Sequence, residues 1–136
     1  MGNPTFRWPV RVYYSDTDAG GVVYHANYLN FFEHARTEML RQAGFEQDQL
    51  MAQNLVFALR QVVMDFIRPA RFNQMLEVIT EITQLGGASL QFEQRLVDAQ
   101  GEVFCQAQIK IGCLSADQFR PIRIPQAIKQ ELARVG

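Results

Sequence analysis

The fold can be inferred from residues 27–44, which read Asn-Tyr-Leu-Asn-Phe-Phe-Glu-His-Ala-Arg-Thr-Glu-Met-Leu-Arg-Gln-Ala-Gly. Apolar residues recur within them at positions 28, 32, 35, 39 and 43, and this spacing is one face of an α-helix. Asn27 is a favourable N-cap and Gly44 a favourable C-terminal stop. The sequence therefore predicts a helix over residues 28–43, with an apolar face broad enough to be buried on more than one side and a polar opposite face.

Strand patterns lie on both sides of this helix. Alternating apolar and polar residues predict strands over residues 6–14, 55–67, 75–85, 88–98 and 102–114. The last pattern is the clearest, because six apolar residues fill every second position from Val103 to Cys113. Gly86-Gly87 and residues 98–101 mark turns, so we expect hairpins to join the long antiparallel strands. A short helix over residues 126–134 follows them.

A single apolar helix among several strands has to be buried against one face of their sheet. The order of elements therefore predicts an α+β fold, in which one curved antiparallel sheet surrounds a central helix. Residues 1–136 contain no repeat and no low-complexity linker, and their number fits one domain. The apolar fraction of 48% and the charged fraction of 20% are typical of a soluble globular chain.

Charge and hydropathy argue against several classes of protein. With 13 basic and 14 acidic residues and no block of like charge, the chain lacks the pattern of a nucleic-acid binder. No apolar run approaches the roughly 18–20 residues of a membrane span, and the N-terminus has no apolar core like that of a signal peptide. We therefore expect no transmembrane segment and a cytoplasmic location. Cys105 and Cys113 lie on the apolar face of a predicted strand, where we expect them to be small buried hydrophobes.

Several common catalytic motifs do not occur in the sequence. None of Ser15, Ser89 and Ser115 lies in a Gly-x-Ser-x-Gly elbow, and there is no Gly-rich phosphate loop. The spacing of the aspartates and histidines between Asp16 and His34 matches no structural zinc pattern. We therefore predict no bound metal and no cofactor.

The loop before the predicted helix holds residues that suit acyl-transfer chemistry. Asp16 and Asp18 precede Gly20-Gly21, and His25 lies just before the helix cap. The N-terminus of a helix has unpaired N–H groups and a partial positive charge, so it stabilises an anion such as the oxyanion of acyl transfer. A carboxylate beside it can act as base or nucleophile. Alternatively, both aspartates only form turns and the glycines shape the loop. The spacing alone leaves both interpretations open.

The segment from Phe6 to Tyr28 resembles the hotdog-fold acyl-CoA thioesterases. More narrowly, it is similar to the YbgC type, which is associated with the Tol–Pal system and belongs with the 4-hydroxybenzoyl-CoA thioesterases. Residues 16–28 carry the signature D-x-D-x-x-G-x-V-x-x-x-x-Y, and the likeness continues through residues 32–41, 67–71 and 76–82. It covers nearly the whole chain. The resemblance implies a hotdog fold, a long helix wrapped by a curved antiparallel sheet, with active sites at a dimer interface and two dimers forming a homotetramer.

The resemblance also implies catalytic roles. It makes Asp18 the catalytic carboxylate, which acts on the thioester carbonyl as nucleophile, through a mixed anhydride, or as general base on water. The oxyanion contact is a backbone N–H at the start of the long helix, which falls at His25. The side chains of His25 and Tyr14 are further catalytic candidates, and Asp16 is expected to be structural. Because thiolate is a good leaving group, one carboxylate and one N–H can be enough, without a serine triad.

Substrate contacts follow from the same resemblance. Arg68 and Arg71 are candidates for the phosphates of coenzyme A, although surface arginines are usually only solvated. In the 4-hydroxybenzoyl relatives, basic residues line the turn equivalent to residues 86–89. This chain has none there, which leaves Ser89 and backbone N–H groups to contribute. Aromatic side chains are expected around the acyl group. The expected substrate-binding residues are Gly20, Gly21, Val22, Tyr24, Phe57, Arg68, Arg71 and Ser89.

Three functions from different classes fit these residues. The first is hydrolysis of acyl-CoA to a free carboxylic acid and coenzyme A. The second is a binding module for acyl carrier protein, or for an envelope or phospholipid-synthesis partner, in which turnover is incidental. The third is a dehydratase of 3-hydroxyacyl thioesters, whose relatives use a histidine with an acid. The Asp-Thr-Asp-Ala-Gly-Gly sequence of residues 16–21 fits the thioesterases better than the dehydratases.

Overall fold

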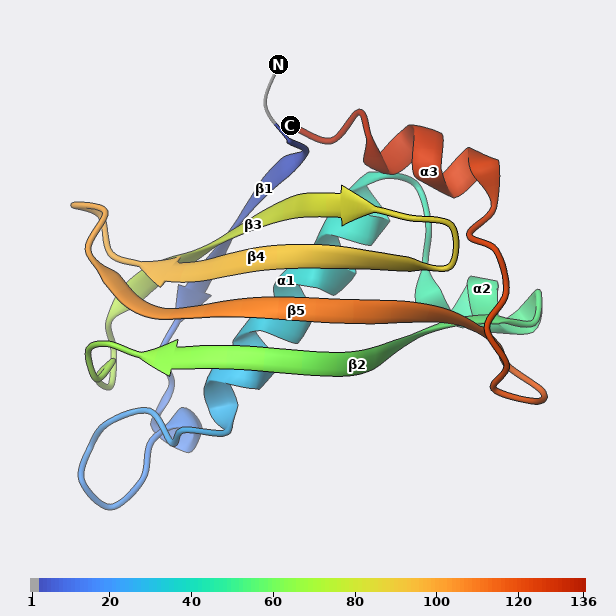
Figure 1. The fold of residues 1–136 in the computed structure, drawn as a ribbon. Coiled ribbons are helices and arrows are strands. Elements are labelled where there is room, and N and C mark those ends of the chain that lie inside the picture. The colour runs from blue at the N-terminus through green and yellow to red at the C-terminus, as the bar shows by residue number, and fades with distance from the viewer. Residues whose placement is uncertain (1–2) are drawn as a thin grey trace.

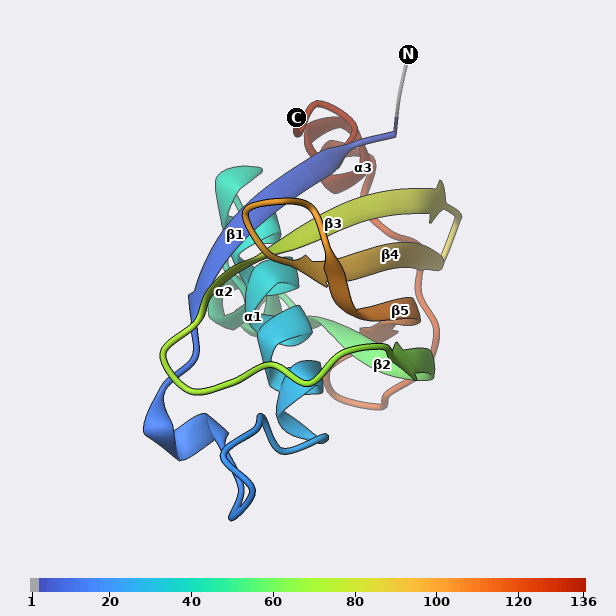
Figure 2. The same cartoon turned by 90° about the vertical axis from the view of Figure 1, so that its left-hand side faces the viewer.

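The computed structural model describes residues 3–136, and its strands form one antiparallel sheet with the order β1-β3-β4-β5-β2. The long helix α1 crosses one face of this sheet (Figures 1 and 2). The elements in chain order are β1 (Thr5–Arg11), the 3-10 helix η1 (Tyr14–Asp16), α1 (Asn27–Gln42), α2 (Gln47–Ala52), β2 (Leu55–Phe66), β3 (Met75–Leu85), β4 (Ser89–Val97), β5 (Val103–Ser115) and α3 (Gln126–Leu132). Within residues 3–136, no helix has both the length and the apolar character needed to cross a membrane. The arrangement confirms the predicted α+β fold with a central helix.

The core lies between α1 and the face of the sheet that α1 covers. Phe32, Ala35 and Met39 of α1 are buried there. Every second residue of the central strands is also buried, as the alternation predicted, and the set includes Leu76, Val78, Ile82, Leu90, Phe92, Leu96, Ala107, Ile109 and Ile111. Each large side chain buried in this way contributes about 1.5–3 kcal/mol. The apolar face of α1 is therefore sufficient to fix the helix on the sheet.

Both cysteines are buried in β5, which confirms their prediction as small buried hydrophobes. Burial, assisted by the negative charge of Asp65, raises the pKa of Cys105 to about 12. Burial also raises the pKa of Cys113. The thiolate is the reactive form of cysteine, so both side chains stay protonated and inert at neutral pH.

The two ends of α1 compare differently with the prediction. Asn27 lies inside the helix and Ala26 is the N-cap, without a side-chain cap, so the predicted cap is wrong. Asn27 Nδ2 instead donates to Asp16 Oδ1 at 3.0 Å, because the loop brings that carboxylate over the first turn. The predicted stop at Gly44 is confirmed. Its φ of 98° lies in the left-handed region, which glycine adopts without strain.

Two predicted boundaries between strands and loops also change. β1 ends at Arg11 rather than at residue 14, because the chain turns into η1, where the carboxylate of Asp16 accepts the N–H of Tyr13 at 2.8 Å. The predicted hairpin between β2 and β3 is wrong. β2 pairs with β5, while β3 pairs with β1 and β4, so residues 67–74 cross between separate strands. Alternation predicts which residues face the core, but it carries no information on which strands pair.

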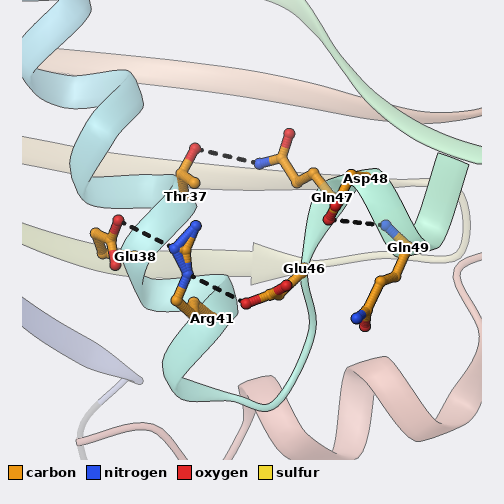
Figure 3. Close-up of polar contacts among 7 residues, drawn as sticks. All are labelled: Thr37, Glu38, Arg41, Glu46, Gln47, Asp48 and Gln49. Atoms are coloured by element: carbon orange, nitrogen blue, oxygen red, sulfur yellow. Dashed lines mark hydrogen bonds and ion pairs between the residues drawn. The ribbon is translucent and has the colours of Figure 1, made fainter.

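The short helix α2 was not predicted, because it buries only Leu50 and has no recognisable apolar period. Polar contacts hold it beside the second half of α1 (Figure 3). Gln47 Nε2 donates to Thr37 Oγ1 at 3.3 Å, and Arg41 Nε lies 3.7 Å from Glu46 Oε1. These contacts join α2 and the residue before it to the second half of α1.

Candidate active site

Backbone pairing holds the loop between η1 and α1. The N–H of Asp18 donates to the carbonyl of Val22 at 2.9 Å, and Val22 pairs in turn with Arg71 of the β2–β3 connection. The N–H of Val23 donates to the carbonyl of Ala70 at 2.8 Å. The loop, which follows directly on Asp16 and contains Asp18, is therefore fixed against a segment that is distant in the sequence.

The two aspartates, Asp16 at the end of η1 and Asp18 in the loop, have different surroundings. Both carboxylate oxygens of Asp16 accept hydrogen bonds, from the N–H of Tyr13 at 2.8 Å and from Nδ2 of Asn27 at 3.0 Å. Asp18 Oδ1 accepts the N–H of Gly20 at 2.8 Å, which is an Asx turn. Its Oδ2 has no hydrogen-bond partner among residues 3–136. Asp16 therefore holds the start of α1, whereas Asp18 has an oxygen free for a ligand.

Asp18 lines an open cavity of about 340 Å³ at the N-terminal end of α1. The other lining residues come from the loop, the first turn of α1, the end of β2 and the segment after it, and they are Val22, Val23, His25, Tyr28, Phe66, Ile67, Arg68 and Pro69. The cavity thus brings together Asp18, Val22, His25 and Arg68 of the predicted site. Apolar side chains form most of its wall, and Asp18 and Arg68 are its fully charged members.

The backbone N–H of His25 makes no hydrogen bond within residues 3–136. His25 lies two residues before α1 begins, so this N–H belongs to the positive end of the helix dipole. A fixed donor in that position can stabilise an oxyanion. The imidazole ring is tilted against the ring of Tyr24, with centroids 4.4 Å apart, and both side chains are exposed.

Tyr28 ties the first turn of α1 to the β2–β3 connection. Its side chain is buried, and its hydroxyl oxygen accepts the N–H of Ala70 at 3.1 Å. The carbonyl of Ala70 accepts the N–H of Val23. Val23 and Tyr28, the last two fixed residues of the sequence signature, therefore bind both backbone polar groups of Ala70. Burial raises the pKa of Tyr28 above its usual value, so the phenol stays neutral. Sequence reasoning gave Tyr28 no role at the site, although it ends the signature.

The two candidate phosphate-binding arginines lie on different sides of the loop. Arg68 lines the cavity, where its NH2 lies 3.3 Å from Glu102 Oε2 in an exposed ion pair. Such pairs contribute only about 0–1 kcal/mol, so a stronger anion can compete for the guanidinium. Arg71 lies outside the cavity, across the backbone pairing from Val22, and makes no ion pair among the described residues.

The remaining loop candidates shape the site without lining the cavity. Gly21 has a φ of 77°, which explains the need for glycine at the tip of the loop. Gly20 donates the N–H that holds Asp18 Oδ1, and Tyr24 donates its N–H to the carbonyl of Asp16 at 2.9 Å.

Three other candidates lie apart from Asp18 within one chain. The ring of Tyr14 packs edge-on against Phe72, with centroids 5.7 Å apart, and does not line the cavity. Phe57 lines a second cavity. Ser89 begins β4, where it pairs with Gly112, at the end of the sheet opposite to Phe66.

The second cavity, of about 290 Å³, lies between α1 and the sheet and contains a charged group that sequence reasoning left in solvent. Arg36 NH1 donates to Gln94 Oε1 at 2.9 Å, and burial lowers the pKa of Arg36 to about 10. Gln94 is fully buried, and its Nε2 donates to the carbonyl of Phe32 and to Thr80 Oγ1, both at 2.9 Å. The inward position of Gln94 in the strand pattern is the feature that indicates a buried polar network here.

Comparison with known proteins places the chain in a family of thioesterases. Residues 12–132 match the Thioesterase-like superfamily, and the chain belongs to this family. It is 47% identical over 131 residues to the acyl-CoA thioester hydrolase YbgC of Escherichia coli O6:H1, an alignment that covers 96% of this chain and 98% of that protein. It is 43% identical to the acyl-CoA thioesterase YbgC of Haemophilus influenzae, over 91% of both proteins.

Solved structures show the same fold. A probable thioesterase from Bartonella henselae is 36% identical, with a TM-score of 0.83, and the match covers 89% of this chain and 99% of that one. A 1,4-dihydroxy-2-naphthoyl-CoA thioesterase from Synechocystis has a TM-score of 0.89 at 23% identity, over 96% of both chains. The second likeness concerns the fold alone. Together they confirm that this helix and sheet arrangement is the fold of thioesterases.

Proposed function

We propose that this protein hydrolyses the thioester of acyl-CoA to a free carboxylic acid and coenzyme A, with Asp18 as the catalytic carboxylate. One observation carries most of the proposal. Asp18, with an unbonded oxygen, and His25, with an unpaired N–H, line the same cavity at the start of α1. Membership of the thioesterase family and the identity with YbgC enzymes support the same activity.

In the proposed reaction, the thioester carbonyl oxygen accepts a hydrogen bond from the N–H of His25, and this bond strengthens as negative charge develops on the oxygen. Asp18 acts in one of two ways. It attacks the carbonyl carbon to give a mixed anhydride that water then hydrolyses, or it removes a proton from an attacking water. In both routes the C–S bond breaks as the tetrahedral intermediate collapses, and coenzyme A leaves as the thiolate.

We propose Arg68 and Arg71 as contacts for the phosphates of coenzyme A. Arg68 lies in the wall of the same cavity as Asp18. Arg71 lies outside the cavity and pairs through its backbone with Val22, which lines it. Because His25 lines the same cavity as Asp18, we propose its imidazole as the side chain that orients water there. Phe57 and Ser89 fit a role only at a site completed by a second copy of the chain, because neither lies near Asp18 in its own chain.

A homo-oligomer is part of the proposal. β2 is an edge strand of 12 residues, and Leu59 and Val63 on it are 51% and 52% exposed. An exposed apolar edge of this length is a template for pairing with a second copy. The resemblance to the YbgC type supports a dimer of dimers, a cytoplasmic location and an association with the Tol–Pal system.

The activity is tested by measuring free-thiol release from a panel of acyl-CoAs, from short to long chains and one aromatic acyl group. Wild type and Asp18→Asn are measured side by side. We expect wild type to hydrolyse part of the panel, and Asp18→Asn to lower kcat by about 100- to 10,000-fold, the range for loss of a general base. Circular dichroism and the unfolding midpoint control for an intact fold.

Any of three results would contradict the proposal. Near wild-type activity in Asp18→Asn would remove Asp18 from the mechanism. No thiol release by wild type across the panel would favour the acyl carrier protein alternative, which is tested with acyl-acyl carrier protein as both donor and bait. Hydration of an enoyl-CoA by wild type would favour the dehydratase.

A further inference from the structure

A well-built turn in the β2–β3 connection exposes an aromatic side chain. The N–H of Gln74 donates to the carbonyl of Arg71 at 3.2 Å, and Gln74 Oε1 accepts the N–H of Arg71 at 2.7 Å. Asn73 has a φ of 73°, which asparagine tolerates better than most residues. Phe72 lies at the corner of this turn, with 53% of its surface exposed. The turn thus presents a large apolar ring to solvent at a fixed position.

The end of β1 anchors the same turn. The N–H of Asn73 donates to the carbonyl of Val12 at 2.8 Å, and the N–H of Val12 donates to the carbonyl of Gln74 at 2.9 Å. Arg11 NH1 donates to the carbonyl of Asn73 at 2.8 Å. The turn therefore has a fixed place relative to the sheet, and a guanidinium group lies against it.

A second aromatic ring extends this surface. Tyr14 packs against Phe72 at an interplanar angle of 65°, with ring centroids 5.7 Å apart, and 79% of Tyr14 is exposed. We call the surface formed by Tyr14, Phe72, Arg11 and Arg71 the aromatic corner. More than half of each side chain is exposed, so the pair offers aromatic surface to a flat ligand.

The aromatic corner carries uncompensated positive charge. Neither Arg11 nor Arg71 makes an ion pair with a carboxylate within residues 3–136. The carboxylate of Asp16 accepts hydrogen bonds from Tyr13 and Asn27 and forms no ion pair with either arginine. A ligand that complements this surface is both aromatic and anionic.

The aromatic corner is also close to the cavity of Asp18. Arg71 pairs with Val22, and the carbonyl of Val22 accepts the N–H of Asp18, so one strand of loop backbone separates them. The β2–β3 connection and the loop before α1 lie at the same end of the sheet (Figures 1 and 2). A long ligand with its reactive end beside Asp18 can therefore place its other end on the aromatic corner.

We propose that the aromatic corner binds the nucleotide end of coenzyme A, with adenine stacked on Phe72 and the phosphates at Arg11 and Arg71. This inference rests on the proposed function, because acyl-CoA supplies an aromatic, anionic group at a distance from its thioester. Adenine presents a π-face for stacking, and guanidinium groups pair well with phosphate. An acyl group on acyl carrier protein has no such nucleotide, so the aromatic corner would favour coenzyme A as the donor.

The test is direct binding, measured by titration calorimetry on the full chain. The probes are coenzyme A and pantetheine, which lacks the nucleotide. For Phe72→Ala we expect the Kd of coenzyme A to rise about tenfold, in the range of one base stacked on one aromatic ring, with the Kd of pantetheine unchanged. The matched control is Phe119→Ala, because Phe119 is 68% exposed and lies in the loop after β5, outside both cavities. We expect it to change neither Kd.

Three results would overturn the inference: an unchanged Kd of coenzyme A in Phe72→Ala, an equal rise for coenzyme A and pantetheine, or the same rise in Phe119→Ala. Loss of binding to anionic phospholipid vesicles in Phe72→Ala, with coenzyme A binding intact, would assign the aromatic corner to a membrane surface instead. Failure of the proposed function would be seen in a different measurement. Wild type would then release no thiol from acyl-CoA, and this result does not depend on the Kd of coenzyme A.

Discussion

Asp18 and Gln94 lie beside the same helix, at its N-terminal end and at its middle, and their polar groups are satisfied to different degrees. Gln94 bonds Arg36, Phe32 and Thr80 within the core. Asp18 lies in an open cavity and keeps one oxygen without a partner among residues 3–136. A buried polar group left unpaired costs about 1–3 kcal/mol, whereas an exposed one is satisfied by water. The difference separates a network that the fold requires from groups that remain open for a ligand.

The largest effect on stability is expected from Gln94→Leu. This change keeps the approximate size of the side chain but leaves the Arg36 guanidinium and the Phe32 carbonyl without their partner in a buried region. We expect the free energy of unfolding to fall by about 3 kcal/mol, the upper end of the cost of leaving buried hydrogen-bonding groups unpaired, because more than one group loses its partner. Chemical denaturation measures this. Gln108→Leu, on the exposed side of β5, is the matched control, and an equal loss in both variants would contradict a special role for Gln94.

An intermediate effect is expected from Tyr28→Phe, because Tyr28 lies between the core and the cavity. The variant keeps the aromatic ring but leaves the buried N–H of Ala70 unpaired, so we expect a loss of about 1–3 kcal/mol in the free energy of unfolding. We also expect kcat to fall, because Ala70 holds the loop of Asp18 through Val23. Tyr13→Phe, at an exposed tyrosine, controls for removal of a hydroxyl. Unchanged stability and unchanged kcat in Tyr28→Phe would show that this hydrogen bond does not position the loop.

The smallest effect on stability is expected from Glu102→Gln, which removes the partner of Arg68 at the wall of the Asp18 cavity. Arg68 and Glu102 form an exposed ion pair, so its loss should change the free energy of unfolding by less than about 1 kcal/mol. The difference should shrink further at high salt, because salt screens exposed charges. Urea denaturation at low and high salt checks both points. A loss as large as that of Gln94→Leu would contradict the contrast between an exposed and a buried polar contact.

The sequence predicts the parts of this structure that depend on local pattern. The period of α1 and the alternation of β3, β4 and β5 correctly indicate which residues are buried, because burial follows directly from side-chain spacing. Strand pairing was less predictable. β2 joins the edge beside β5, and this choice depends on contacts between distant residues. The predicted cap at Asn27 is wrong for the same reason, because the side chain of Asn27 donates a hydrogen bond to the carboxylate of Asp16 instead.

The candidate site divides in a similar way. The family resemblance led to Asp18 and His25, and the structure places both in one cavity. Arg36 was missed, because its place on a polar helix face gives no sign that Gln94 lies opposite. Phe57 and Ser89 lie far from Asp18 within the chain, and sequence spacing alone carries no information on such distances.

A comparison of Asp16→Ala with Asp18→Asn in one experiment separates the structural aspartate from the proposed catalytic one. Thiol release from acyl-CoA and the free energy of unfolding are measured on both variants. We expect Asp18→Asn to lower kcat by about 100-fold or more with little change in stability. We expect Asp16→Ala to lose about 1–2 kcal/mol of stability, because it removes the hydrogen bonds to the N–H of Tyr13 before η1 and to Nδ2 of Asn27 at the start of α1. Retention of activity in Asp18→Asn, or its loss only together with the fold, would contradict the assignment of Asp18 as the catalytic carboxylate.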